Sequence, residues 1–314
     1  MKTPKRIAEA LNQKEALLND ARNRFEKIVL NFQAELYEDV LTEVIRDIET
    51  SDGAILDNAD NYRIAMKVEK LYRAFTVRVA SVLLPEMSST TTEIVDLTKK
   101  YFTSVMNDLP ARFENVVEST KTLIDLKIGL RQGKMIRGGL ISQMLNIPPQ
   151  ELQSLMSRAV SSQMDMKDFI TAVKEQIKGS EVKAGVYDRQ LKRFAYDTYQ
   201  QYDAAYNKKL AEEFEMRYFV YQGGLVGDSR DFCAAHNNKV WSIEEAQEWP
   251  NWTPSKGEYP EGYEVKAKDL YAVPSYIDYP GYDPLTDRGG YNCRHIIGFI
   301  TDDLAMKLRP GLKE

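Results

Sequence analysis

The stretch DSRDFCAAHNNKVW, residues 228–241, together with RGGYNCRHIIGF, residues 288–299, decides how the C-terminal part of this chain can fold. The 314-residue chain has two cysteines and two histidines, and all four lie in these stretches: Cys233, His236, Cys293 and His295. Residues three apart on a helix or turn share a side, as do residues two apart on a strand. Each stretch can therefore offer two ligand atoms to one point.

Two cysteines and two histidines are the donor set of a tetrahedral structural zinc site. Between the two pairs, residues 250–284 hold six of the twelve prolines and form a long loop, which is uncommon in a compact domain unless something holds it. A bound metal would close this loop and supply folding free energy directly. We therefore predict that Cys233, His236, Cys293 and His295 bind a structural zinc ion.

Two other interpretations of these four residues stay open. They can be two reduced structural cysteines and two histidines in ordinary polar contacts. They can also form an active site, either with Cys233 or Cys293 as a thiol nucleophile or with a zinc ion and Glu244 or Glu245 as the base. A catalytic zinc keeps one position open, whereas four candidate ligands indicate a closed site.

Two arginines flank the ligand pairs. Arg230 precedes Cys233 by three residues, where its charge favours the thiolate and can pair with Asp228 or Asp231. Arg294 lies between the second pair, so on a strand it would face away from the ligands. There it would be free to bind a carboxylate, phosphate or backbone carbonyl, or it would simply be exposed or ion-paired.

The region before residue 217 has the apolar spacing of successive helices. Apolar residues recur every seven positions and then every four along a first long helix: Leu11, Leu18, Phe25, Phe32, Leu36, Val40, Val44 and Ile48. SDGA at 51–54 ends it. Further helices are predicted at about 58–84, ending at Pro85, at 91–105, after Pro110, within IPPQELQSLMSRAV, within DMKDFITAVKEQIKG, and at 184–216. GLRQGKMIRGG, residues 129–139, predicts a hinge, a short hairpin or a surface loop.

After residue 216 the composition changes to that of a small mixed module. RYFVYQ, residues 217–222, and CRHIIGFI predict strands, and Ser242 with Glu245 predicts a capped short helix at about 243–248. The fold class is therefore mainly α: a long N-terminal helical region followed by a small irregular α+β C-terminal module with a zinc staple. The predicted domains are 1–145, 146–216, 217–300 and a tail at 301–314.

Composition bounds the function. Hydrophobic residues make up 43% and charged residues 28%, and the net charge is −5, which argues against DNA binding through overall positive charge. The segment 129–139, with Arg131, Lys134 and Arg137, is the candidate basic patch for a DNA-contacting protein. There is no secretory signal and no apolar run of about 18 residues, so we expect no membrane span. Two cysteines make no disulfide framework, which favours a reducing compartment.

Three segments, SRDFCAAH, NNKVWS and GGYNCRHIIGFI, resemble the C-terminal module of the phage Mu F-like head-morphogenesis proteins, the minor head or minor capsid proteins of tailed phages. That family has an Arg-x-x-Cys-x-x-(Cys or His) element and a closing Asn-Cys-Arg-(Cys or His) element. Upstream, FAYDTYQQYDAAYN and YFVYQGG match the family's helix and strand. The resemblance covers roughly residues 150–300. His236 and His295 stand where many members have cysteine, and the 250–290 loop is long.

This resemblance implies a structural virion component rather than an enzyme. It implies assembly in the host cytoplasm, a place at the portal vertex or head interior, and portal, capsid or scaffolding proteins as partners. Some members of the family leave the head with the DNA, and an internal protein that contacts the packaged DNA stays an alternative function for this chain. Residues 1–145 carry no motif of the family, and we expect them to bind a partner.

Overall fold

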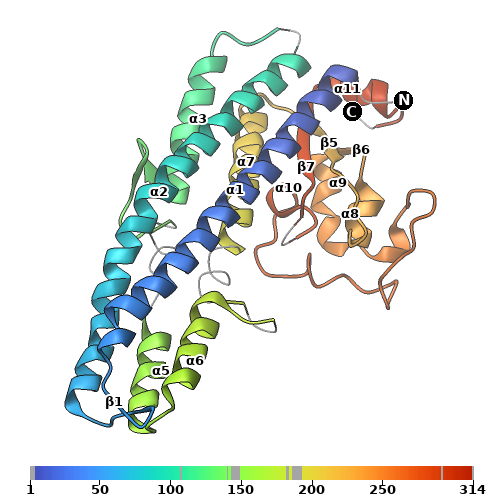
Figure 1. Ribbon diagram of the computed structural model, residues 1–314. Helices are drawn as coiled ribbons and strands as arrows, with labels where there is room; N and C mark the ends of the chain where they lie inside the picture. Colours follow the sequence, from blue (N-terminus) through green and yellow to red (C-terminus); the bar gives the residue numbers. More distant parts are fainter. Residues whose placement is uncertain are drawn as a thin grey trace. The chain divides into compact units, whose positions relative to one another are not determined.

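Helices dominate the computed structural model, which describes residues 4–106, 108–139, 141–142, 149–181, 184–185, 193–290 and 293–312, with the backbone alone for 193–197 (Figure 1). A small three-stranded sheet lies in its C-terminal part. The predicted fold class, a long N-terminal helical region followed by a small irregular α+β module, is confirmed. In the part of the chain described, no helix is both long and apolar enough to cross a membrane.

Contacts divide the chain into two compact units. One unit consists of Met1–Ala21, Ser89–Leu126 and Asp197–Glu314, and the other of Arg22–Ser88 and Lys127–Tyr196. Both units join segments that are distant in sequence, whereas the four predicted domains follow the chain in order. That sequence-based division stays a prediction.

The first helix, α1 (Lys5–Glu43), carries the predicted apolar stripe. Its seven-residue repeat is buried, with Leu11 and Phe25 fully covered. A 3₁₀ turn, η1 (Ile45–Asp47), and a hairpin of β1 (Thr50–Ser51) and β2 (Ala54–Ile55) follow. The predicted break at 51–54 is therefore a tight hairpin turn.

The second helix, α2 (Ala59–Val105), corrects the prediction of two helices separated at Pro85. Proline within a helix removes one hydrogen bond and costs about 3 kcal/mol. The apolar stripe nevertheless continues through it, with Leu83 and Met87 buried on either side of Pro85 and Ile94 buried farther on. Burying this continuous stripe outweighs the local cost, so propensity alone gave the wrong boundary.

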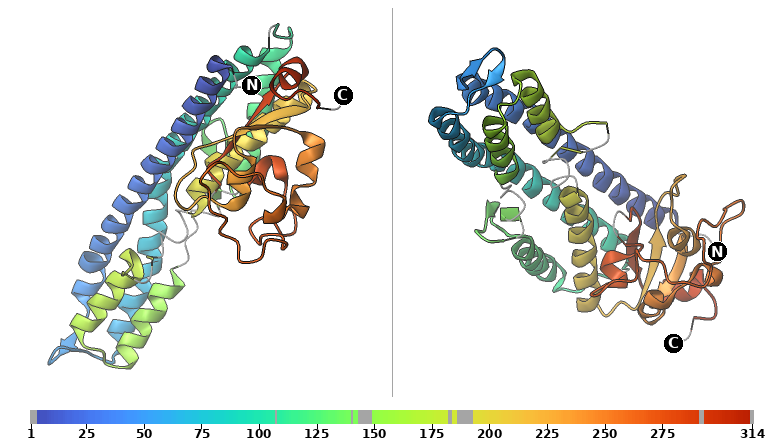
Figure 2. Two further views of the ribbon diagram at one scale, coloured as in Figure 1. Left: turned by 90° about the vertical axis from the view of Figure 1, so that its right-hand side faces the viewer. Right: turned by 90° about the horizontal axis from the view of Figure 1, so that it is seen from below.

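The next elements mostly follow the predicted order. They are α3 (Phe113–Ile128), β3 (Leu130–Arg131), β4 (Lys134–Met135), α5 (Gln150–Ser161), α6 (Met166–Lys178) and α7 (Arg193–Glu213). The segment 129–139 forms a hairpin, one of its three predicted conformations. Asp165 caps α6 by accepting a hydrogen bond from the Lys167 backbone, as predicted. Helices α5 and α6 pack side by side (Figures 1 and 2). The start of α7 predicted near residue 184 lies outside the described residues.

The sheet of the C-terminal module has β5 (Tyr218–Gln222) between β6 (Lys239–Ser242) and β7 (Ile296–Ile300), all antiparallel. The sheet packs against α2, where Tyr101 donates a hydrogen bond to the Phe299 carbonyl of β7 at 2.9 Å. Gly298 permits this approach, since a Cβ there would lie 2.5 Å from the Tyr101 hydroxyl.

Short helices complete this module around the sheet (Figure 2). They are α8 (Asp231–His236), α9 (Ile243–Gln247), η3 (Trp249–Asn251), η4 (Pro254–Lys256), α10 (Pro284–Asp287) and α11 (Asp302–Leu308). The predicted capping box of α9 is present in full, with Ser242 and Glu245 bonded to each other's backbone. The sequence predicted that Cys293 and His295 lie on the closing strand. That strand begins at Ile296, so both residues precede it.

Candidate metal centre

Three of the four predicted ligands meet in one buried cluster. Cys233 comes from α8, and Cys293 and His295 come from the segment that leads into β7. The Sγ atoms of the two cysteines are 3.8 Å apart, and Cys293 Sγ lies 3.9 Å from His295 Nδ1. The three ligand atoms lie within 4.8 Å of one another, and none of the residues is more than 4% exposed. This group could hold a metal ion.

The spacing of the sulfurs fits a tetrahedral metal. Bonds of about 2.3 Å from zinc to sulfur place two ligand sulfurs about 3.8 Å apart. That is the distance between Cys233 and Cys293. His295 Nε2 is buried without a hydrogen-bond partner among the described residues, so this imidazole is incompletely satisfied by the protein alone. The sulfur spacing favours a bound cation at this position, whereas the unpartnered Nε2 is the ring nitrogen other than the Nδ1 that lies nearest Cys293 Sγ.

Two glycines leave room for the cluster. A Cβ on Gly289 would lie 2.5 Å from Cys233 Sγ and 3.2 Å from Cys293 Sγ, so any side chain there would fill the space between the sulfurs. A Cβ on Gly223 would lie 2.9 Å from the His295 ring. These positions were quoted in the sequence motifs, but the reason that they are glycine appears only in three dimensions.

Tyr221 closes the remaining side of the cluster. Its hydroxyl lies 3.5 Å from Cys233 Sγ and 3.3 Å from Cys293 Sγ, and its ring stacks on His295 at 4.9 Å. Sequence reasoning missed Tyr221, because it reads as an ordinary strand residue. The Gly289 backbone and this hydroxyl thus cover two sides of the three-ligand group, and all three of its residues are buried.

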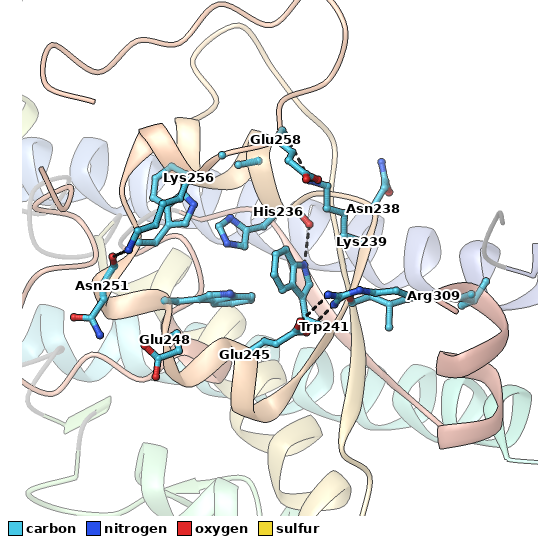
Figure 3. Close-up of a pocket in the computed structure, with 16 residues that line it drawn as sticks. His236, Asn238, Lys239, Trp241, Glu245, Glu248, Asn251, Lys256, Glu258 and Arg309 are labelled. Atoms are coloured by element: carbon cyan, nitrogen blue, oxygen red, sulfur yellow. Dashed lines mark hydrogen bonds and ion pairs between the residues drawn. The ribbon is translucent and has the colours of Figure 1, made fainter. Parts of the chain in front are cut away.

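His236 does not join the other three. Its ring stacks on Phe232 at 4.0 Å and lies 4.7 Å from Trp241 and 4.9 Å from Trp249. It lines a pocket of about 710 Å³ beside Trp241 (Figure 3). Residues four apart on a helix share a face, so His236 follows Phe232 into the aromatic cluster, while Cys233 faces the sulfur site. The structure therefore gives three ligands where the sequence predicted four.

The protein environment shifts the pKa values of the two thiols in opposite directions. The pKa of Cys233 is raised, because its thiol is hydrogen-bonded to Cys293 and because it is buried. Burial would also raise the pKa of Cys293, but the hydrogen bonds with Cys233 and His295 lower it well below the usual value. Metal binding requires deprotonated sulfur, and the lowered pKa of Cys293 favours it.

Burial lowers the pKa of His236 to about 3. In the unfolded chain a histidine takes up a proton below about pH 6.5, whereas folded His236 stays neutral. The contribution of neutral His236 to the free energy of unfolding is therefore fully present above that pH and is lost as the pH decreases toward 3. We expect wild type to lose about 2 kcal/mol more than His236→Phe between about pH 6.5 and pH 5. Urea unfolding of both proteins measures this difference, and parallel pH profiles would contradict it.

The two arginines lie differently from each other. Arg230 donates to the Gly289 carbonyl at 2.7 Å, and its guanidinium lies 4.8 Å over the Tyr276 ring. It thereby holds the backbone that covers the sulfurs instead of making the predicted pair with Asp228 or Asp231. Arg294 is exposed between two buried residues, in agreement with its predicted orientation away from the ligands.

Two further residues hold the loop around the centre. The buried Asp231 carboxylate accepts hydrogen bonds from the Tyr263 hydroxyl at 2.9 Å and from the backbone of Lys266 and Ala267 at 2.9 and 2.8 Å. Arg288 is 3% exposed and donates to the His295 carbonyl at 2.8 Å. The role of Asp231 could not be predicted from the sequence, because its partners lie more than thirty residues away in the chain.

Comparison with protein-family models, with curated proteins and with solved structures found no match to this chain. Its function must therefore be argued from its own residues and their geometry.

Proposed function

We propose that this chain is a structural, non-enzymatic minor head protein of a tailed bacteriophage. In this proposal it acts in head morphogenesis at the portal vertex or head interior, and a metal-stabilised C-terminal module carries its family motifs. The phage assignment is supported by the resemblance of SRDFCAAH, NNKVWS and GGYNCRHIIGFI. The helical N-terminal region would contact portal, capsid or scaffolding proteins.

The observation that carries the structural role is the buried cluster of Cys233, Cys293 and His295. Its two sulfurs and one imidazole are soft and borderline donors, which favour zinc over hard cations such as magnesium or calcium. Zinc is redox-inert and would contribute folding free energy to the module. The sulfur spacing and the space kept by Gly289 support this assignment.

A hydrolase using the same residues has less support. A nucleophilic thiol must reach its substrate, whereas each cysteine here is 4% exposed. The Tyr221 hydroxyl and the Gly289 backbone also lie directly against the two sulfurs, which limits the approach of a substrate from these sides.

Two measurements on the native protein test the proposal. Immunoblotting of purified phage particles, separated into heads and tails, is expected to find the chain in heads. Elemental analysis of the purified chain is expected to give about one zinc per molecule. Absence from heads would contradict the head-protein assignment. Metal-free folded protein would contradict the zinc site, and the two results are independent of each other.

A further inference from the structure

A second buried cluster, made of residues other than the candidate metal ligands, lies where α1 meets α7 (Figure 1). Lys14 falls in the apolar stripe of α1, three residues after Leu11 and four before Leu18, and its side chain is 1% exposed. Asp203 and Asn207, one turn apart on α7, are each 1% exposed. A lysine in such a position is almost never fully buried without a specific reason.

The three side chains contact one another directly. Lys14 Nζ lies 2.9 Å from Asn207 Oδ1 and 2.7 Å from Asp203 Oδ1. Asn207 Nδ2 donates to the same Asp203 oxygen at 3.0 Å and to the Asp203 carbonyl at 2.6 Å. One carboxylate oxygen therefore contacts both the lysine nitrogen and the amide nitrogen. Asn207 Cγ is one C=O bond from the oxygen that Lys14 Nζ contacts, so attack requires the lysine nitrogen to move from this oxygen to the face of the amide carbon.

The environment makes it easier for the Lys14 amine to give up a proton. Burial lowers the pKa of Lys14, against the opposing effect of Asp203, and the positive charge of Arg288 lowers it further. Asp203 Oδ2 has no hydrogen-bond partner among the residues described. A buried ion pair with an unsatisfied oxygen is costly in free energy. A reaction that removes the lysine charge and keeps the contacts would relieve that cost.

We propose that Lys14 and Asn207 form an intramolecular isopeptide bond, with Asp203 as the proton carrier. Lys14 Nζ passes a proton to Asp203, and its lone pair then attacks Asn207 Cγ, forming the Nζ–Cγ bond while the carbonyl electrons move to Oδ1. Asp203 gives its proton to Nδ2, the carbonyl reforms, and the Cγ–Nδ2 bond breaks.

The proton balance closes without any other reactant. Asp203 takes the second excess proton from Nζ and passes it to the departing ammonia, which leaves as ammonium. The lysine ammonium and the asparagine amide thus become one secondary amide and one ammonium ion, and Asp203 ends as it began. The bond ties α1 to α7 covalently across 193 positions of sequence.

Lys14 attacks Asn207 and not Asp203, because the position of Asp203 suits it to carry the proton. Attack on Asp203 would require that carboxylate to be protonated and to lose water, and its side-chain partners among the described residues are Lys14 and Asn207, neither of them a second acid. Attack on Asn207 has Asp203 in contact with both the entering and the leaving nitrogen. The two reactions are distinguished by the mass lost, ammonia in one case and water in the other.

Intact mass spectrometry of the folded wild-type chain tests this directly. We expect a mass lower than that of the sequence by one ammonia, and after trypsin a branched peptide joining residues 7–22 to 194–208, uncut at Lys14. Lys14→Arg should show the full mass. Asp203→Asn should slow the reaction by about a hundredfold or more, the contribution of a positioned proton carrier. Lys5→Arg, at an exposed lysine on the same helix, should react like wild type.

The wild-type result decides the proposal whether or not the variants fold. Wild-type protein that has native circular dichroism but keeps its full mass after prolonged incubation overturns it. Loss of water instead of ammonia overturns the choice of Asn207, and a branched peptide that joins other residues overturns the site.

Discussion

Cys293→Ser is expected to abolish metal binding and to lower the free energy of unfolding of the C-terminal module by more than about 4 kcal/mol. Structural zinc contributes about 10–16 kcal/mol of apparent binding free energy in zinc-finger peptides, and serine is a poor ligand for it. The loss here should be smaller than that full value, because the sheet β6-β5-β7 supports the module without metal. Metal content, and chelator-induced unfolding followed by the fluorescence of the three tryptophans, measure the effect.

His236→Phe is the matched control for this experiment. Phenylalanine preserves the ring that stacks on Phe232, and His236 lies outside the group formed by Cys233, Cys293 and His295. This variant should therefore keep about one metal per chain. A His236→Phe protein that loses its metal would restore the four-ligand site predicted from the sequence. A Cys293→Ser protein that keeps its metal would contradict both arrangements.

The sequence predicted the parts of the fold that depend on periodic burial. The stripe from Leu11 to Phe32 specifies one helix face, and a helix of that length has few alternatives. Pro85 shows the limit of this reasoning, because a local penalty was taken as a boundary although burial continued beyond it. Local propensity indicates that a residue such as Pro85 destabilises a helix, but tertiary packing decides whether the helix ends there.

The candidate metal centre was predictable in part for a similar reason. Rare residues concentrated in two motifs indicated where ligands would be, and three of them do meet. His236 was assigned by spacing alone, and spacing cannot distinguish a metal from an aromatic cluster on the neighbouring face of α8. Tyr221 and Asp231 were missed because their partners are brought to them by the fold. Lys14 carried a usable signal, a charge within an apolar stripe.

Asp231 also changes how the long loop must be understood. From the sequence, the proline-rich segment needed a metal to order it. The structure adds a carboxylate that accepts three hydrogen bonds from Tyr263, Lys266 and Ala267. Hydrogen bonds to a charged group contribute about 1.5–3 kcal/mol each, although such values do not simply add. The loop is thus held at its ends by the sulfur cluster and in its middle by Asp231.

Asp231→Ala is accordingly expected to release the middle of the loop while leaving the metal in place. We expect a loss of about 3 kcal/mol in local stability, and therefore cleavage by trypsin at Lys266 and Lys268 about a hundredfold faster than in wild type. Metal content should stay at the wild-type level. Asp228→Ala, at an exposed neighbouring carboxylate, should change neither quantity. If the metal alone orders this segment, Asp231→Ala will be cleaved no faster than wild type. Simultaneous loss of metal and of protease resistance would mean instead that Asp231 holds the ligand helix α8 and acts on the loop through it.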